Sequence, residues 1–327
     1  MTLITRASPQ TLRLLALGLA LLATVLFFAT QIEGYISPRM FNRISTSAAV
    51  VLPIAVGQAI VIMTRNIDLS AGSVMGVTAY MTGQLLNTMP DLHPALAVLF
   101  CMALGAAFGA LNGIIIAFGR VPSIIVTLGT LALFRSFLVE WSDAKTITTA
   151  SLPQWLVELP SANAFSIGGL DIRVTVVIAL AACIVTGAAL TFYRPARRFY
   201  AVGSNPDAAV MAGINANRVV LTAFILSGAF AGLSGFLFLA KFGNITVVAG
   251  LGFELKAIAA VVVGGVSIMG GSGSMIGVLM GALLVDTIDN SLTRWAVISE
   301  FWRDALLGGL IMAAVTVDTL ASRQLTR

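Results

Sequence analysis

The sequence has few charged residues, one histidine, three lysines and two cysteines. Charged residues make up 10% of the chain and hydrophobic residues 58%, whereas a typical soluble domain has about 25% charged residues. One soluble core could not keep that much apolar surface away from water, so the composition excludes a soluble globular protein and predicts a chain that crosses a membrane several times. The net charge of +5 comes largely from arginines between apolar segments, and it gives no reason to expect a nucleic-acid partner.

The scarcity of particular side chains also excludes several kinds of site. A metal site of the H-E-x-x-H type needs two histidines, and the chain has only His93, in a predicted turn. A nucleotide-binding P-loop needs Gly-Lys before Ser or Thr, but the one lysine so followed, Lys145, comes after Ala144. No G-x-S-x-G nucleophile motif occurs. Cys101 and Cys183 fall in apolar segments and are predicted to be free thiols. We therefore expect neither an enzyme nor a metal or cofactor.

Ten apolar segments approach the length of about 20 residues that a helix needs to span a bilayer. They predict an all-α polytopic membrane protein, built as one transmembrane domain over residues 1–327. Six spans fall in residues 12–192 and four in residues 219–320, on either side of a basic loop at 193–218. The ten predicted spans are Leu12–Ile32, Ser45–Thr64, Gly72–Met89, Pro94–Phe118, Pro122–Glu140, Ile172–Phe192, Val219–Ala240, Leu255–Gly270, Gly273–Thr293 and Trp302–Leu320.

The distribution of arginine predicts which ends of the spans face the cytoplasm. The loop at 193–218 carries four arginines against a single acidic residue, Asp207, and arginines also lie near both ends of the chain. Because positively charged loops stay on the cytoplasmic side, we predict that both termini and this loop are cytoplasmic. The segment from Trp141 to Asp171 is then the longest external connection. Its prolines and the Gly168-Gly169 pair favour an irregular loop.

The loop at 193–218 contains the pattern of a short helix. Asn205, Pro206 and Asp207 provide a cap residue, a proline at the first position and an acid in the first turn. The apolar run that follows predicts one or two helical turns, and Gly213 predicts their end. Such a cytoplasmic helix can transmit movement from a soluble partner to the spans. An ordinary basic loop is the other interpretation of the same residues.

Two spans carry glycines at positions i, i+4 and i+8, which leave a smooth groove on one helix face and allow close packing. Generic helix packing accounts for each set alone. The matched spacing also suggests a repeat in which spans two to five are echoed by spans seven to ten. Five spans separate the two sets, so the copies would be inverted, an arrangement common in transporters. The two sets are Gly105, Gly109 and Gly113 in the fourth span and Gly273, Gly277 and Gly281 in the ninth.

An acidic residue follows the second span. Asp68 near hydrocarbon would cost about 2.5–3.5 kcal/mol on the insertion scale, so we expect it to pair with Arg65 or a backbone end, or to face water. Alternatively, Asp68, Ser70 and Ser73 could cap the start of the third span, because Asp and Ser accept hydrogen bonds from the first N–H groups of a helix.

Further polar residues lie within or beside the spans. Glu254 and Lys256 are predicted at the external mouth of the eighth span, where they form a gate or docking feature, or else a solvated turn. Gln58 and Asn112 lie inside spans, where each either joins helices by hydrogen bonding or lines a path. Structural and path-lining roles are both compatible with these residue types and positions.

Three motifs together resemble those of the permease subunits of ribose-type ABC sugar importers. They are RNIDLSAGSVMG at 65–76, FYAVGSNPDAAVMAGINANR at 199–218 and GFELKAIAAVVVGGVSIMGGSG at 252–273. The resemblance extends from about residue 41 to 318. It implies a bundle of about ten spans in the bacterial inner membrane, surrounded by lipid and used as a pair. It also implies an ATP-binding subunit on the cytoplasmic face and a periplasmic solute-binding protein outside. The Arg65-Asn66 start of the first motif is most similar to autoinducer-2 and rhamnose permeases.

Carried onto this chain residue by residue, the resemblance assigns two sets of positions. The first set implies a coupling segment that sits in the cleft of the ATPase: Gly203, Asn205, Asp207, Ala208, Ala209, Gly213 and Ile214. The second set implies structural or path-lining roles: Asn66, Asp68, Ser70, Gly72, Ser73 and Glu254.

The sequence thus predicts a permease subunit of an ATP-driven importer of a monosaccharide or sugar-like solute, paired with a copy of itself or a sister chain. One alternative is an ABC permease for branched-chain amino acids, whose permeases have a similar central loop. The other is a self-sufficient transporter coupled to an ion gradient. That alternative needs ionisable residues within spans, and here it could use only Arg135, Asp286 and Asp289.

Overall fold

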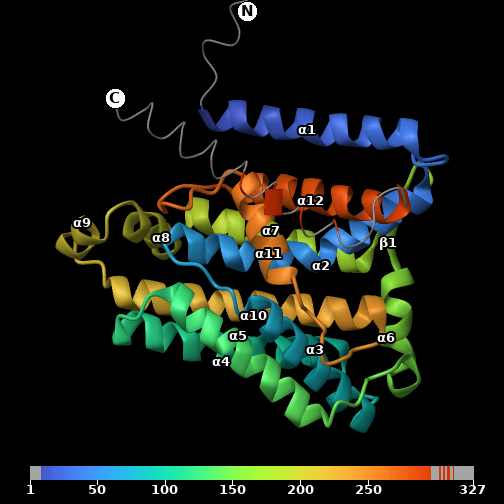
Figure 1. Cartoon of the computed structure of the whole chain (residues 1–327), viewed down its shortest axis with the longest axis horizontal. Helices are drawn as coiled ribbons and strands as arrows, with labels where there is room; N and C mark the ends of the chain where they lie inside the picture. Colours follow the sequence, from blue (N-terminus) through green and yellow to red (C-terminus); the bar gives the residue numbers. More distant parts are fainter. Residues whose placement is uncertain (1–8, 296–301, 303–304, 306–307, 310–311, 313–327) are drawn as a thin grey trace, which may run out of the picture.

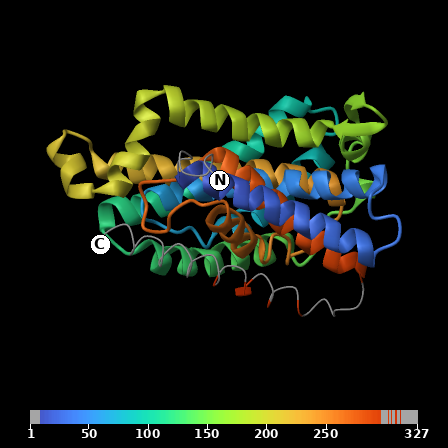
Figure 2. The same cartoon turned by 90° about the horizontal axis from the view of Figure 1, so that it is seen from above.

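The fold is known from a computed structural model of the chain (Figures 1 and 2). Two predictions concern residues outside the described part of the chain. They are the cytoplasmic location of the two termini and most of the tenth span, Trp302–Leu320. The structure describes residues 9–295 and, beyond them, Trp302, Ala305, Gly308, Gly309 and Met312.

Seven helices in this described part are long and apolar enough to cross a membrane. They correspond to the first, second, fourth, fifth, sixth, seventh and ninth predicted spans, which confirms a polytopic helical membrane protein. The seven are α1 (Pro9–Gln31), α2 (Pro38–Met63), α4 (Pro94–Gly119), α5 (Ser123–Ser142), α7 (Val174–Phe192), α10 (Ala216–Phe242) and α12 (Met275–Trp295).

The third and eighth predicted spans are helical but differ from the other seven. α3 (Ala71–Thr88) and α11 (Phe253–Val263) are the shorter helices of the bundle, and neither is among the seven. Each follows a non-helical segment, 64–70 before α3 and 243–252 before α11. The total of ten spans stays a prediction.

The long helices run alongside one another between two ends of the bundle (Figure 1). At one end, α8 (Arg194–Ser204) and α9 (Pro206–Met211) project from the bundle. The other end carries α6 (Gln154–Glu158) and an antiparallel pair of strands, β1 (Asn163–Ile167) and β2 (Leu170–Arg173). We call these the α8–α9 end and the β-hairpin end.

The connection between α5 and α7 is more regular than the sequence predicts. It contains two 3-10 turns, at Thr149–Ser151 and Leu159–Ser161, as well as α6 and the β-hairpin. Gly168 and Gly169 have φ angles of +56° and +82°. A two-residue hairpin turn of type I′ requires positive φ angles at both positions, and glycine adopts them without steric cost. The glycine pair therefore closes a hairpin, and the expected irregular loop is wrong for this segment.

α2 and α10 form the centre of the bundle. In their most apolar stretches, 89% of the α2 residues and 72% of the α10 residues are buried. α4 packs so closely on α10 that a Cβ atom at Gly105 or Gly109 would collide with the backbone of Gly228 or Phe224. Close approach of backbones is what small residues provide between membrane helices.

The glycines of α12 pack against a different neighbour. A Cβ atom at Gly277 or Gly281 would collide with the carbonyls of Gly264 or Ala260, at the end of α11. Gly273 does not extend this set, because α12 begins only at Met275 and Gly273 has a φ angle of +155° in the preceding loop. The inverted repeat of spans two to five and seven to ten stays a prediction.

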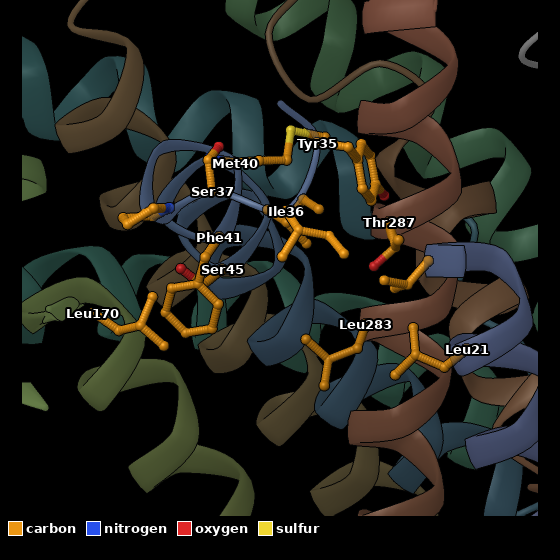
Figure 3. Close-up of a pocket in the computed structure, with 13 residues that line it drawn as sticks. Leu21, Tyr35, Ile36, Ser37, Met40, Phe41, Ser45, Leu170, Leu283 and Thr287 are labelled. Atoms are coloured by element: carbon orange, nitrogen blue, oxygen red, sulfur yellow. The ribbon is translucent and has the colours of Figure 1, made fainter. Parts of the chain in front are cut away.

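α1 lies on the outside of the bundle, against α12 (Figures 1 and 2). Its Leu15 and Leu19 side chains are 59% and 66% exposed, as expected for side chains that face lipid. A cavity of about 440 Å³ opens between α1, α2 and α12, and most of its lining is apolar, including Leu21, Met40 and Leu283 (Figure 3). The exposed leucines of α1 and this apolar cavity are suited to contact with membrane lipid.

Candidate functional site

α9 begins and ends where the sequence predicts. The Asn205 side chain accepts a hydrogen bond from the Ala208 N–H at 3.0 Å, and Asp207 lies in the first turn. Gly213 follows the helix with a φ angle of +77°, a left-handed conformation that glycine adopts readily at helix ends. The predicted helix start and stop are confirmed.

The outer face of α9 is apolar and open. Val210 is 59% exposed and Met211 is 90% exposed, whereas Ala209 is buried and Ile214 packs against the core. We call these two exposed side chains the apolar tip of α9. The exposed arginines on the neighbouring helix α8 are Arg194, Arg197 and Arg198.

The basic stretch before α9 is predicted as loop but forms the amphipathic helix α8. Its buried side includes Ala196, Phe199 and Val202, a spacing of three that places them on one helix face. That spacing was the available signal, and the arginines between these positions obscured it. The Tyr200 hydroxyl donates to the Gly273 carbonyl at 3.0 Å. Burial raises the pKa of this hydroxyl above its usual value, so it remains a donor at neutral pH.

Three chain segments meet at the end of α8. The Arg65 guanidinium donates to the carbonyls of Gly203 and Ser204, and the Gly271 N–H donates to the Met63 carbonyl at 3.0 Å. A Cβ atom at Gly203 would collide with backbone atoms of Met63 and Gly271. The end of α8 is therefore locked between the end of α2 and the loop from α11 to α12. We call this contact the Gly203 junction.

Asp68 lies inside the bundle and is only 2% exposed. Its Oδ1 accepts hydrogen bonds from the Ser70 N–H at 3.0 Å and the Ser70 hydroxyl at 2.7 Å, and its Oδ2 accepts one from the Ser227 hydroxyl at 3.0 Å. Asn112 donates to the Ser70 Oγ at 2.8 Å. Asn66, in contrast, bonds locally. These bonds join the 64–70 segment to α4 and α10, and we call them the Asp68 network.

The structure decides between the alternatives for this segment: Asp68 pairs with a backbone end, because the Ser70 N–H donates to its carboxylate. Arg65 does not pair with Asp68, because its guanidinium is engaged at the Gly203 junction. Nor does a side chain cap α3: Ser70 is the cap residue without a side-chain cap bond, and the Ser73 hydroxyl donates back to the Ser70 carbonyl. The carboxyl group of Asp68 is instead satisfied by Ser70 and by Ser227. The second partner is far away in the sequence, and no local pattern could have identified it.

Ser227→Ala is expected to lower the free energy of unfolding by about 1–3 kcal/mol, because it leaves a buried carboxyl oxygen of Asp68 without its hydroxyl partner. Thermal unfolding of the detergent-solubilised protein measures the effect. Ser161→Ala, which removes an exposed hydroxyl, is the control and should melt like the wild type. Equal melting temperatures for both variants would contradict a structural role for the Asp68 network.

α3 lies directly against the loop before α11. A Cβ atom at Gly72 would collide with the Glu254 Oε2 and the Gly250 carbonyl, and one at Gly76 would collide with the Ala249 carbonyl. The first turns of α3 therefore have no room for side chains at these two positions. We call this region the α3–α11 contact.

The loop before α11 is folded back into the bundle. Gly250 and Gly252 have φ angles of +78° and +82°, which only glycine adopts without strain. Arg135, from α5, donates to the carbonyls of Val247 and Ala249 at 3.1 and 2.5 Å. An arginine predicted inside a span thus anchors this loop.

The folded-back loop buries two charged residues that were predicted at an external mouth. Glu254 and Lys256 are each 8% exposed, so a solvated turn is wrong. The Lys256 Nζ lies 2.9 Å from the Asp286 Oδ1 and 2.6 Å from the Asp289 Oδ2, tying α11 to α12. Within residues 9–295, no three His, Cys, Asp or Glu side chains gather as metal ligands would.

Comparison with known proteins gives consistent matches. Residues 40–315 match the protein family described as branched-chain amino acid transport system / permease component. The autoinducer 2 import system permease protein LsrC of Enterobacter sp. (strain 638) is 34% identical over 315 residues, which cover 96% of this chain and 89% of that protein. The LsrC protein of Salmonella typhi is 33% identical over 300 residues, covering 92% of this chain and 84% of that protein. No solved structure gives a significant match.

Proposed function

The chain belongs to the branched-chain amino acid transport system / permease component family, and we propose that it is the transmembrane subunit of an ATP-driven, binding-protein-dependent importer. The proposed solute is a monosaccharide or sugar-like compound, with autoinducer-2 the first choice. Support for this choice comes from the relatives above, which are named as autoinducer 2 import permeases and align with most of the chain. ATP hydrolysis would belong to a separate subunit.

One observation carries the proposal of a separate ATPase. α9 projects from the bundle with an apolar tip, and the helix before it is locked to two other segments at the Gly203 junction. A soluble partner bound to α9 can therefore move α2 and the loop from α11 to α12 together. α2 continues into the Asp68 network and α3, while the loop leads back to α11. Movement at α8 would thus reach both short helices of the bundle.

In this proposal, ATP binding and hydrolysis bring the two ATPase halves together and apart. The α8–α9 segments of two permease subunits follow and alternate the access of the path to either side of the inner membrane. A periplasmic solute-binding protein docks at the β-hairpin end. The proposed coupling residues are those assigned above, from Gly203 to Ile214. Asp68, Ser70 and Glu254 are proposed to hold or line the path.

Met211→Glu is expected to weaken binding of the ATP-binding subunit about tenfold or more, because it places a charge at the centre of an apolar contact. Pull-down of the tagged ATP-binding subunit with solubilised permease measures binding, and ATP-dependent uptake measures the consequence. Met269→Glu is a matched control, since Met269 is 73% exposed in the loop from α11 to α12. Wild-type binding and uptake by the Met211 variant would overturn the proposed docking surface.

A branched-chain amino acid is a second candidate solute, favoured by the description of the family. ATP-dependent uptake of leucine, D-ribose, L-rhamnose and autoinducer-2 by the reconstituted importer separates the two. Uptake of leucine without any of the other three would replace the sugar proposal. An ion-coupled transporter is less well supported, because Asp286 and Asp289 are engaged by Lys256.

A further inference from the structure

The α3–α11 contact holds two polar side chains with buried atoms that have no hydrogen-bond partner among the described residues. The Glu254 Oε1 accepts a hydrogen bond from the Gly252 N–H at 3.2 Å, but its Oε2 accepts none from the part of the chain that the structure describes. The Arg135 Nη1 donates to the carbonyls of Val247 and Ala249, while its Nε has no acceptor within the described ranges. Because most buried polar atoms in proteins are paired, this pair of atoms calls for an explanation.

Both side chains lie beside the first turns of α3. The Glu254 Oε2 lies against Gly72, and the Arg135 Nη1 would lie 3.5 Å from a Cβ atom at Gly76. Asn112 adds a third group at the start of the same helix, since its Nδ2 donates to the Ser70 Oγ and its Oδ1 is also without a partner in the described part of the chain. Two acceptors and a donor thus surround the beginning of α3.

The surrounding backbone has the features of a path through the membrane. Irregular backbone at membrane depth occurs where it is buried in protein or lines a polar cavity, and interrupted helices often form solute sites in transporters. Here the non-helical segments before α3 and α11 come from opposite ends of the bundle, one after the end of α2 and the other beside the Ile147–Ile245 bridge. The short helices that follow them meet at Gly72 and Glu254.

We propose that the α3–α11 contact is the place in the path where the permease itself binds a neutral, polyhydroxylated solute, with Glu254 Oε2 and Arg135 Nε as its hydrogen-bonding groups. A hydroxyl group both donates and accepts, so neighbouring hydroxyls of one sugar satisfy a carboxyl oxygen and a guanidinium N–H together. The ammonium and carboxylate groups of a branched-chain amino acid would satisfy the same two atoms, so the choice of a sugar comes from the proposed import function and not from these atoms. The inference rests on the proposed import function and assigns the place in the permease where its solute binds.

The contact must open for a solute to enter, because Glu254 lies directly against Gly72. α11 leads into the loop whose Gly271 is held at the Gly203 junction. Separation of α11 from α3 is therefore linked to movement of α8. Position 254 should be reachable from water during turnover, whereas a residue buried for packing alone should never be.

The first test measures that accessibility in proteoliposomes that contain the permease, its ATP-binding subunit and its solute-binding protein. Glu254→Cys is treated with a hydrophilic methanethiosulfonate reagent during ATP turnover, and labelling is followed by mass spectrometry. The control is Ala259→Cys, fully buried on the same helix, in the background of two buried native cysteines. We expect labelling at 254 to be about tenfold faster than at 259, and slower when D-ribose, L-rhamnose or autoinducer-2 saturates the binding protein. Equal, slow labelling at both positions would overturn the inference.

The second test measures uptake by Glu254→Gln in the same complete importer. Loss of a charge-assisted hydrogen bond is expected to lower sugar uptake about tenfold, with binding of the ATP-binding subunit unchanged. Glu140→Gln, an exposed change on α5, should transport like the wild type. If the wild type takes up none of the three sugars, the proposed import function fails. If the wild type takes up sugar and Glu254→Gln matches it within about twofold, only the present inference fails.

Discussion

Gly203→Val is expected to lower ATP-driven uptake at least about tenfold. The added side chain overpacks the Gly203 junction, which costs about 1–3 kcal/mol of packing free energy and favours separation of the segments that meet there. Backbone atoms of Met63 and Gly271 stand on both sides of the space that the new side chain needs. Neither can turn away as a flexible side chain could, so the end of α8 must separate from α2 or from the loop between α11 and α12. Either separation disconnects the α8–α9 segment from the membrane helices.

The measurement is uptake by the complete importer in proteoliposomes, alongside pull-down of the ATP-binding subunit. Binding should persist, because the exposed tip at Val210 and Met211 is unchanged. Gly129→Val is the matched control: a Cβ atom at this α5 glycine meets nothing within 4 Å, so uptake should remain normal. Wild-type uptake by the Gly203 variant would show that the Gly203 junction does not transmit movement.

Lys256→Met is expected to destabilise the protein by about 3–5 kcal/mol, the usual effect of removing one partner from a buried ion pair. The substitution takes the ammonium group away from Asp286, which is fully buried, and from Asp289. Asp286 keeps hydrogen bonds from Ser47 and Asn290, but these supply no full positive charge. α11 should then detach from α12 at lower temperature.

Thermal unfolding in detergent measures this loss. Lys145→Met, which removes an exposed lysine paired with exposed Asp143, should leave the melting temperature unchanged. Adding Asp286→Asn and Asp289→Asn to Lys256→Met removes the uncompensated charge and should recover much of the stability. A Lys256→Met protein that melts like the wild type would show that these ion pairs do not hold α11 in place.

Local signals in the sequence were sufficient for several elements. Seven apolar segments predicted the spanning helices, because a run of about 20 apolar residues has few other stable conformations in a bilayer. The bounds agree within about three residues, except that α2 begins at Pro38, seven residues before the predicted start at Ser45. The start of α9 at Asn205 and its end before Gly213 also followed from local capping chemistry. These features depend on residues that are neighbours in the chain.

Features that depend on distant contacts could not be predicted in the same way. Glu254 and Lys256 lie beside an apolar segment and looked like residues at its mouth, but Gly250 and Gly252 turn the preceding loop into the bundle. The hydroxyl that satisfies Asp68 comes from Ser227 in α10. Burial of these charges depends on which helices pack together. The spacing of buried residues in α8 was visible, yet the arginines between them favoured loop.

The structure suggests why the two short helices are placed as they are. α3 and α11 meet near polar groups. The segment before α3 and the loop after α11 both lead to the end of α8, at the Gly203 junction. A soluble partner acting on α9 can therefore change the contact where Glu254 and Arg135 have polar atoms without a partner among the described residues. The proposed docking surface for the ATP-binding subunit and the proposed solute site are therefore separate parts of the protein, linked through the Gly203 junction.

ATP-dependent uptake by proteoliposomes, compared with and without the ATP-binding subunit, tests this mechanism most directly. The permease and a loaded solute-binding protein are present in both preparations, and D-ribose, L-rhamnose and autoinducer-2 are the probes. We predict uptake only when the ATP-binding subunit and ATP are both present, and loss of that uptake with Met211→Glu. Uptake of the same probes by the permease alone under an ion gradient would contradict coupling through α8 and α9.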